Sequence, residues 1–229
     1  MALKPKKLLG LKYSIFQDII KGNEELHVQK ARLIPFYKPG DEMALTSIFL
    51  SSLKMVDPYR KNIFKTINLS NYGKLHIFTE VEFVLFDKKR VDGLILIERG
   101  KKIVDACIFE VKNKNNELNL NQLNDYVKIC KAYNIPKMVT ISNQFVNFPT
   151  QSPVNLKTPK NVTAYHLSWT YLLTVAHIFL IDNNTNIDDA DQYNILKEVL
   201  RYFETKKSGI VGFHQMKSGW VEVCQKINS

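Results

Sequence analysis

The sequence of 229 residues predicts an α/β protein in which helices flank a central mixed β-sheet. Two observations support this fold class. The stretch 91–112 consists of two apolar segments separated by a short turn, and an apolar strand at 137–142 follows a helical pattern over 118–133. A hairpin pairs its strands antiparallel, whereas a strand–helix–strand crossover returns the chain in the parallel direction. The sheet is therefore expected to contain both kinds of pairing.

Before the hairpin we expect one short strand, two helical segments and a longer strand. The segment 26–37 reads as the short strand, and Asp41 is placed to cap a helix of about four turns. Apolar residues recur at helical spacing after this cap: Leu45, Ile48, Phe49, Leu53 and Val56. A polar helical turn is expected around 57–67, and the apolar alternation over 75–86 predicts the longer strand.

After the hairpin, the helix at 118–133 has its expected core residues at Leu120, Leu123, Val127 and Cys130. The stretch from Asn143 to Asn161 is rich in Pro, Ser, Thr and Asn, which predicts a long loop, and a last strand follows it. From Trp169 onward the pattern is helical, with an aspartate-capped helix near 189–204 and a short helix at 218–227. We expect a core over residues 1–168 and a helical C-terminal extension over 169–229 that packs on it.

The formal charge of +10 and the pI near 9.4 favour a polyanionic partner, although a solvated lysine face is the plain alternative. Cys107 and Cys130 are expected to be small buried hydrophobes, and with Cys224 they show no metal-ligand spacing. This usage suits a reducing cytosol, so a cytoplasmic location is expected. The longest apolar run, near 169–181, is too short to cross a bilayer, and no signal peptide is expected, so no membrane is expected as a partner.

Charged residues stand where the open ends of the hairpin meet. Asp92 lies at the start of its first strand, and Glu110 and Lys112 lie at the end of its second. Carboxylates and lysines are poor strand formers and are costly wherever a sheet is covered. Residues two apart on a strand share a face, so Glu110 and Lys112 are expected to point the same way. This arrangement indicates a candidate site.

The position of Asp92 relative to Glu110 depends on the hairpin turn. A three-residue loop of Arg99, Gly100 and Lys101 places Asp92 opposite Ile108, on the same face as Glu110 and one diagonal away. A two-residue loop beginning at the same arginine pairs Asp92 with Cys107 and turns it to the other face. The sequence leaves both registers open.

Two carboxylates about 7–8 Å apart at their Cα atoms can converge on one cation. Mg²⁺ prefers oxygen ligands and is commonly held by one or two carboxylates, together with waters and substrate phosphates. A lysine beside such an ion can orient or help to deprotonate a water, or neutralise charge that develops on a phosphate. The plain alternative is a pair of solvated strand ends, with Glu110 and Lys112 forming a weak ion pair on one face.

The order of these elements resembles a known family. From Glu80 to about Ser142 the chain reads EVEF, VDGLIL, IFEVK, NLNQLNDY and KMVTIS. This series resembles the PD-(D/E)xK nuclease superfamily and its restriction-endonuclease-like core, over about a third of the chain. One departure is that Val91 stands where many members have proline, at a position that varies in the superfamily and binds no metal.

The resemblance implies roles for individual residues. The metal-binding acid of the family falls on Asp92, its second acid on Glu110 and its lysine on Lys112, while the backbone carbonyl of Val111 is often a further ligand. The segment QLNDY resembles the glutamine–tyrosine helix motif of the RecB-like branch. That motif maps onto Gln122 and Tyr126, which lie four residues apart and therefore share a helix face.

Two further glutamates are candidates for the metal site. Members of the superfamily often carry a glutamate that faces the metal from the helix before the sheet, and Glu42 occupies that place. A glutamate in a first helical turn also favours the helix dipole, so both readings of Glu42 stay open. Glu80 is open as well, because its strand would have to lie beside that of Asp92. For Glu82 we prefer a solvent-facing position.

These observations lead to the expectation of a Mg²⁺- or Mn²⁺-dependent nuclease that hydrolyses phosphodiester bonds. DNA is preferred as the substrate, and RNA stays open because the chemistry at phosphorus is similar. The alternative is a catalytically inactive or partner-dependent module on the same fold, which binds nucleic acid or another protein. A homodimer or a larger defence or repair assembly is compatible with the resemblance, although a fold by itself is weak evidence of biological role.

Overall fold

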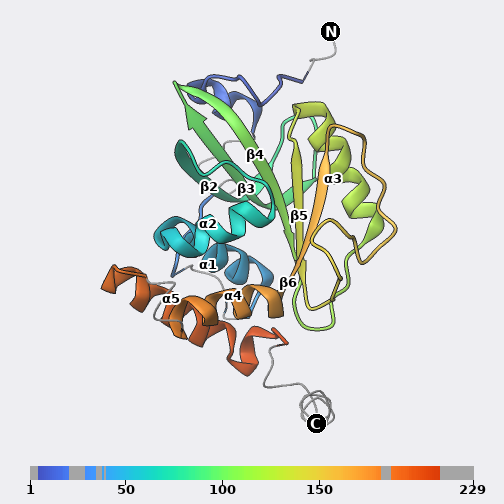
Figure 1. Cartoon of the computed structure of the whole chain (residues 1–229). Coiled ribbons are helices and arrows are strands. Elements are labelled where there is room, and N and C mark those ends of the chain that lie inside the picture. The colour runs from blue at the N-terminus through green and yellow to red at the C-terminus, as the bar shows by residue number, and fades with distance from the viewer. Residues whose placement is uncertain (1–4, 21–28, 35–37, 39, 182–186, 212–229) are drawn as a thin grey trace.

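The computed structural model describes residues 5–20, 29–34, 38, 40–181 and 187–211, and its centre is one mixed β-sheet with helices on both faces (Figure 1). The predicted fold class is thereby confirmed. Along the chain the elements are η1 (Tyr13–Ile19), β1 (Gln29–Lys30), α1 (Glu42–Met55), α2 (Asp57–Thr66), β2 (Lys74–Glu82), β3 (Arg90–Arg99), β4 (Lys102–Val111), α3 (Leu120–Tyr133), β5 (Lys137–Ser142), β6 (Thr163–Ser168), α4 (Trp169–Ile181), α5 (Ala190–Phe203) and η2 (Lys206–Ser208).

The strands lie in the sheet in the order in which they occur in the chain, from β1 to β6. Strands β1 to β4 pair antiparallel, and β4, β5 and β6 pair parallel. The crossover through α3 explains the change of direction after β4, and the long segment 143–162 joins β5 to β6. The carboxyl ends of β4, β5 and β6 therefore lie at the same edge of the sheet.

Each face of the sheet has its own hydrophobic core. One core joins the sheet to α1, α2, α4 and α5, and Phe49, Phe109 and Trp169 lie at its centre. The other joins the opposite face to α3 and η1, and includes Leu94, Ile108 and Met138. Because the central strands are covered on both sides, they read in the sequence as continuous apolar runs. The helices after Trp169 share the first core with α1.

Gly93 lets α1 approach the sheet closely beside Asp92. A Cβ atom at this position would lie 2.6 Å from Leu50 Cδ1 and 3.2 Å from Phe109 Cβ. The first distance would force the end of the Leu50 side chain to move and the second is tight, so a larger residue would disturb the packing of α1 on β3. The close approach holds α1 against β3 next to the candidate site.

The turn between β3 and β4 differs from the expectation. Arg99 pairs with Lys102, so the loop has two residues, Gly100 and Lys101, with φ angles of 58° and 63°. Positive φ at both central positions is the type I′ geometry, whose twist matches that of the strands it joins. This loop is neither of the two that the sequence left open, because both of those included Arg99.

A β-bulge corrects the register that this turn would otherwise impose. The pairing shifts between Ile97 and Glu98, and beyond the shift Gly93 pairs with Phe109. One residue further along the same ladder, Asp92 comes opposite Glu110. Without the bulge Asp92 would lie opposite Phe109, on the other face, because a slip of one residue inverts every side chain. Asp92 therefore lies on the same face as Glu110, which is one of the two arrangements that the sequence left open, and the two acids are direct neighbours rather than diagonal ones.

Other details differ from the sequence-based expectations. The strand predicted over 75–86 ends at Glu82, and Leu120, expected in the core, is 38% exposed at the start of α3. Asp41 occupies the N-cap position of α1, but its side chain makes no capping hydrogen bond. Cys224 and the helix expected at 218–227 lie outside the described residues.

Other expectations are confirmed. Cys107 and Cys130 are buried free thiols. Among the helices that the structure describes, none has the length and apolar character that crossing a membrane requires.

Candidate active site

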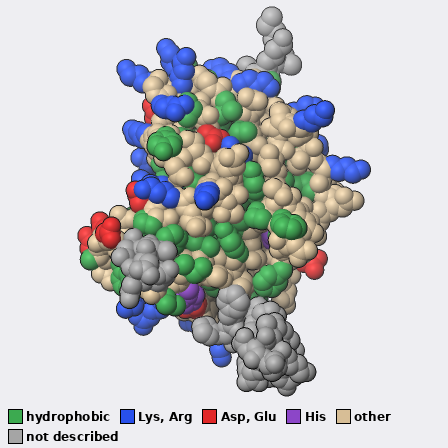
Figure 2. Space-filling model, in the orientation of Figure 1, with side chains coloured by type: hydrophobic (Ala, Val, Ile, Leu, Met, Phe, Trp, Pro, Cys, Tyr) green, Lys and Arg blue, Asp and Glu red, His purple; other side chains and the backbone are tan. Residues whose placement is uncertain are grey.

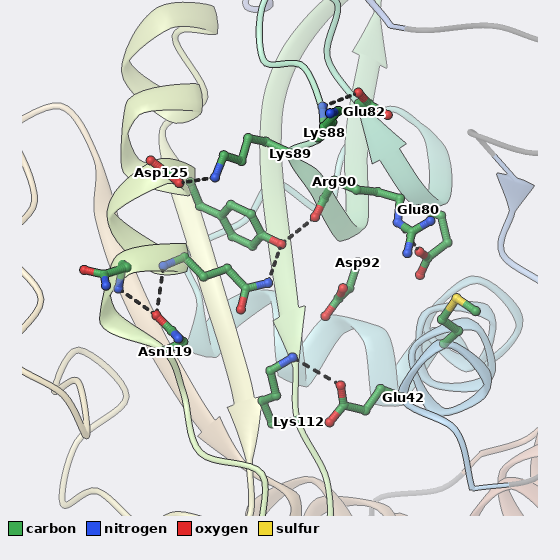
Figure 3. A pocket seen from close by; sticks show the side chains of 14 residues that line it. Glu42, Glu80, Glu82, Lys88, Lys89, Arg90, Asp92, Lys112, Asn119 and Asp125 are labelled. Carbon is green, nitrogen blue, oxygen red and sulfur yellow. Dashed lines mark hydrogen bonds and ion pairs between the residues drawn. The ribbon is translucent and has the colours of Figure 1, made fainter.

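A cavity of about 660 Å³ opens between α3, the N-terminus of α1 and strands β2 and β3 (Figure 3). Six of the residues that the sequence singled out line it: Glu42, Glu80, Asp92, Lys112, Gln122 and Tyr126. The side chain of Glu110 is fully buried, and its carboxylate forms an ion pair with Lys112, which lines the cavity. The structure therefore brings the candidate residues together, although they come from five separate elements and the segment after β4.

Asp92 and Glu110 form the acidic centre of this site. Asp92 Oδ2 accepts a hydrogen bond of 2.7 Å from the backbone N–H of Val111, which fixes the carboxylate at the end of the hairpin. Burial raises the pKa of Asp92 well above its usual range, and the neighbouring charge of Glu110 raises it further. Two carboxylates in such a place are costly unless a cation lies between or beside them.

Lys112 follows Glu110 by two residues and lies between two carboxylates. Its Nζ is 2.8 Å from Glu110 Oε1 and 3.1 Å from Glu42 Oε2. Burial alone would lower the pKa of Lys112, but Glu110, Asp92 and Glu42 outweigh it and raise that pKa above its usual value. The side chain is therefore a cation throughout the physiological pH range.

The backbone of Lys112 is also held in place, by one hydrogen bond at each of its polar groups. Its N–H donates to the carbonyl of Ile141 on β5 at 2.8 Å, and its own carbonyl accepts from Trp169 Nε1 at 2.8 Å. Trp169 opens α4, so a helix of the C-terminal region contacts the residue directly. Its position is fixed from both the sheet and the helical layer.

Glu42, the first residue of α1, turns into the site. Besides Lys112, its carboxylate accepts hydrogen bonds from Asn116 Nδ2 at 2.7 Å and from the backbone N–H of Asn113 at 3.3 Å. Figure 3 shows Glu42 facing Lys112 across the lower part of the cavity. The structure thus places this glutamate among site residues as well as in a first helical turn.

Gln122 and Tyr126 approach the site from α3. The side chain of Asn119 caps this helix by accepting from the backbone N–H groups of Asn121 and Gln122. Gln122 Nε2 donates to the Tyr126 hydroxyl at 2.9 Å, and that hydroxyl donates to the carbonyl of Arg90. Burial raises the pKa of Tyr126, and the nearby acids Glu110 and Asp92 raise it further, so the phenol stays protonated.

Glu80 has an unusual backbone for a residue inside a strand. Its φ angle is 57°, and in the register of β2 and β3 it lies opposite Asp92. Left-handed backbone is uncommon for residues other than glycine and costs of order 1–3 kcal/mol when it is held in place. The carboxylate is buried, and its Oε2 lies 2.7 Å from Nε of Arg90.

The carboxylate oxygens of Glu80 and Glu110 can accept hydrogen bonds that the described residues do not donate. All four are buried, and no hydrogen bond of acceptable geometry reaches them from the residues that the structure describes, so their contacts with Arg90 and Lys112 are ion pairs only. Buried carboxylate oxygens are normally satisfied by donors or by a metal ion. The site therefore has the excess negative charge and the oxygen donors that suit a divalent cation.

The number of side-chain ligands is nevertheless small. Within the described ranges, no three His, Cys, Asp or Glu side chains lie close enough together to form a metal-binding group. Asp92 and Glu110 are the pair best placed to hold a cation, with the carbonyl of Val111 as a further oxygen. An ion held by two carboxylates would take its remaining ligands from water and substrate, as Mg²⁺ commonly does.

Sequence reasoning missed one wall of the cavity. Lys88, Lys89 and Arg90, at and just before the start of β3, line it, and Lys89 Nζ lies 2.7 Å from Asp125 Oδ2 on α3. The KKR run directly before Val91 was the available signal. Figure 2 shows further Lys and Arg side chains around the rim of one face of the molecule, with apolar side chains near its centre.

No model of a known protein family matches the chain, and no curated protein matches it either.

Proposed function

We propose that this protein is a Mg²⁺- or Mn²⁺-dependent nuclease that hydrolyses phosphodiester bonds, with DNA as its substrate. The observation that supports it best is the position of Asp92 opposite Glu110 with the Lys112 ammonium 2.8 Å from the Glu110 carboxylate. Acidic ligands and a fixed cation beside one open cavity suit attack on a phosphate, where negative charge increases in the transition state.

In this proposal Asp92 and Glu110, with the carbonyl of Val111, hold the metal ion. When bound, such an ion supplies Lewis acidity toward a phosphate oxygen and lowers the pKa of a bound water. The hydrogen bond from the Val111 N–H keeps the Asp92 carboxylate aimed at the site. Glu42 contributes by holding the Lys112 ammonium together with Glu110.

Lys112 acts by charge. Because its pKa is raised, it is a poor general base at neutral pH, and its role is to orient the attacking water and to stabilise charge on the phosphorane. Gln122 and Tyr126 orient the scissile phosphate or a ligand from the wall that α3 forms. Gln122 has a second amide proton to donate, whereas the proton of the Tyr126 hydroxyl goes to the carbonyl of Arg90, so Tyr126 acts by holding Gln122 in place.

The test is cleavage of supercoiled plasmid and of single-stranded DNA with Mg²⁺, Mn²⁺ or EDTA, using the wild type and Glu110→Ala. We expect metal-dependent cutting that the variant loses, and the balance of nicked and shortened products will distinguish internal from terminal cleavage. A matching series with RNA tests the choice of substrate. Folded wild type that cuts none of these substrates with either metal would contradict the proposal.

The second candidate is a nucleic-acid-binding or protein-interaction module that keeps the fold without catalysis. It is favoured by the absence, among the described residues, of a three-ligand metal group. Both candidates predict salt-dependent binding of nucleic acid, so binding does not separate them. Metal-dependent turnover does.

We also propose a cytoplasmic location, which the buried free thiols of Cys107 and Cys130 support. A homodimer, or a larger defence or repair assembly, stays a prediction from the family resemblance alone.

A further inference from the structure

We propose that Arg90 forms a phosphate-binding subsite of this cavity and that buried Glu80 positions its guanidinium rather than binding a metal ion. The ligand would be a phosphate of the nucleic-acid backbone next to the one that is cleaved. This inference rests on the proposed function, because it assumes that a nucleic acid enters the cavity.

The sheet brings Arg90 and Glu80 together. Arg90 is the first residue of β3 and pairs with Glu82 on β2, whereas Glu80 lies opposite Asp92. Glu80 and Arg90 are therefore diagonal neighbours, at the range where long side chains meet across two strands. Figure 3 shows the two side chains in contact on the wall beside Asp92.

The two partners differ in burial. The side chain of Glu80 is 3% exposed and that of Arg90 is 50% exposed, so the carboxylate is fixed inside the protein and the guanidinium extends into the cavity. A guanidinium carries five N–H donors in a rigid plane, and Nε is the atom that faces Glu80. Its outer nitrogens are then available for the paired contacts that arginine makes with phosphate oxygens.

The backbone of Arg90 is fixed as well. Its carbonyl accepts the hydroxyl of Tyr126, which in turn accepts from Gln122 Nε2. A cation held at both its backbone and its side chain loses little conformational freedom when it binds an anion. Arg90 is therefore better organised for phosphate than Lys89, whose ammonium is already paired with Asp125.

The strained backbone of Glu80 fits this role. A φ angle of 57° near the end of β2 persists only where surrounding contacts require it, and the ion pair with Arg90 is one such contact of the carboxylate. The rival role is a metal ligand, which the unused acceptor capacity of Glu80 would suit. The two roles can be distinguished by substituting Glu80. Loss of a positioning residue weakens phosphate binding, whereas loss of a metal ligand weakens metal binding.

The first test measures binding of a fluorescein-labelled single-stranded DNA oligonucleotide in EDTA over a range of salt concentrations. For Arg90→Ala we expect affinity about tenfold lower, as for one charge-assisted contact, and a salt slope smaller by about 0.7. Arg99→Ala is the matched control, because this exposed arginine lies at the other end of the same strand, and it should match the wild type. Wild-type affinity and slope in Arg90→Ala would overturn the subsite.

The second test assigns Glu80. We expect Glu80→Gln to weaken oligonucleotide binding about as much as Arg90→Ala and the double variant to be no weaker than Arg90→Ala, because Glu80 acts through Arg90. Calorimetric titration with Mn²⁺ should give affinity within twofold of the wild type. Loss of Mn²⁺ binding with unchanged oligonucleotide affinity would overturn the positioning role and make Glu80 a metal ligand.

Failure of the subsite can be told apart from failure of the proposed function. If the wild type cleaves DNA with metal but Arg90→Ala keeps its affinity and slope, only the subsite is wrong. If the wild type neither binds nor cleaves nucleic acid, the proposed function fails, and the subsite with it. Should Arg90→Ala fold poorly because it leaves Glu80 buried and unpaired, the double variant removes both charges and carries the same binding prediction.

Discussion

At the scale of single residues, Asp92 is costly to the folded protein. It lies opposite Glu110 in the wall of the cavity, and its carboxylate accepts a hydrogen bond from the backbone amide of Val111. Burial and, after it, the charge of Glu110 raise the pKa of Asp92, which means that its ionised form destabilises the folded state. A catalytic site often retains such a cost because the same charge binds the ligand.

Asp92→Asn tests this balance. The amide keeps the shape and can still accept from Val111, but it removes the charge. Without metal we therefore expect a higher Tm, by about 2–4 °C for each 1 kcal/mol gained in a protein of this size. Mn²⁺ should raise the Tm of the wild type and not that of the variant, and cleavage should fall by about 10²-fold or more. A lower Tm together with an unchanged Mn²⁺ shift would contradict the assignment of Asp92.

His166 is a buried titratable residue that does not line the cavity. It lies on β6 next to Thr140, its Nδ1 is 2.9 Å from Thr140 Oγ1, and its Nε2 is 2.9 Å from the carbonyl of Gln144. A carbonyl only accepts, so Nε2 carries a proton and donates it to Gln144. Burial lowers the pKa of His166 below its usual value of about 6.5.

This shift predicts how stability depends on pH. The unfolded chain takes up a proton on His166 near pH 6.5, whereas the folded protein does so only at lower pH, so the stability from this residue is present above pH 6.5 and is lost as pH falls. We expect the Tm difference between the wild type and His166→Gln to be largest at pH 7.5 and to shrink toward pH 5. Thermal unfolding across that range measures it, and a constant difference would show that titration of His166 does not contribute.

At the scale of elements, the C-terminal region holds the chain segment that follows Lys112. Asn113, directly after Lys112, donates through Nδ2 to the carbonyl of Gly40 at 2.8 Å and to that of Ser208 at 2.7 Å. The N–H of Lys114 donates to the carbonyl of Gly209. The Asn113 side chain thus ties the segment before Glu42 to the end of η2, and it does so directly after Lys112, the ion-pair partner of Glu42.

Asn113→Ala is expected to weaken this support. Two buried carbonyls would lose their donor, which should lower the free energy of unfolding by about 1–3 kcal/mol. Because Glu42 and Lys112 would be held less firmly, cleavage should slow about tenfold while DNA affinity stays within threefold of the wild type. Asn62→Ala, at an exposed position of α2, is the control and should leave both unchanged. Loss of DNA affinity without loss of turnover would argue that the segment binds substrate instead.

At the scale of the whole molecule, the periodic elements could be predicted and the details of pairing could not. Apolar periodicity identified the mixed sheet and the site strands because burial on one or both faces leaves a local pattern. The bulge at Ile97 and Glu98, which brings Asp92 opposite Glu110, leaves none. Neither does the left-handed backbone of Glu80, since only contacts distant in sequence hold it.

The same distinction applies to the site. Its acids and lysine were predicted because charged residues are conspicuous in apolar strands. Arg90 and Asn113 were missed because each acts through partners that the fold brings near: Glu80 is ten residues away from Arg90, and Gly40 and Ser208 are 73 and 95 residues away from Asn113. Sequence spacing carries no record of such contacts.

The central claim is that Lys112 and the two acids act on charge that develops during phosphodiester hydrolysis. The most direct measurement is single-turnover cleavage of a labelled DNA with Mg²⁺, paired with DNA affinity measured in EDTA, for the wild type and Lys112→Ala. We predict that the rate falls by about 10²–10³-fold, as when a transition-state donor is removed, while the affinity changes by less than about threefold. A Lys112→Ala protein that cleaves at the wild-type rate once saturated, and loses only binding, would contradict this claim.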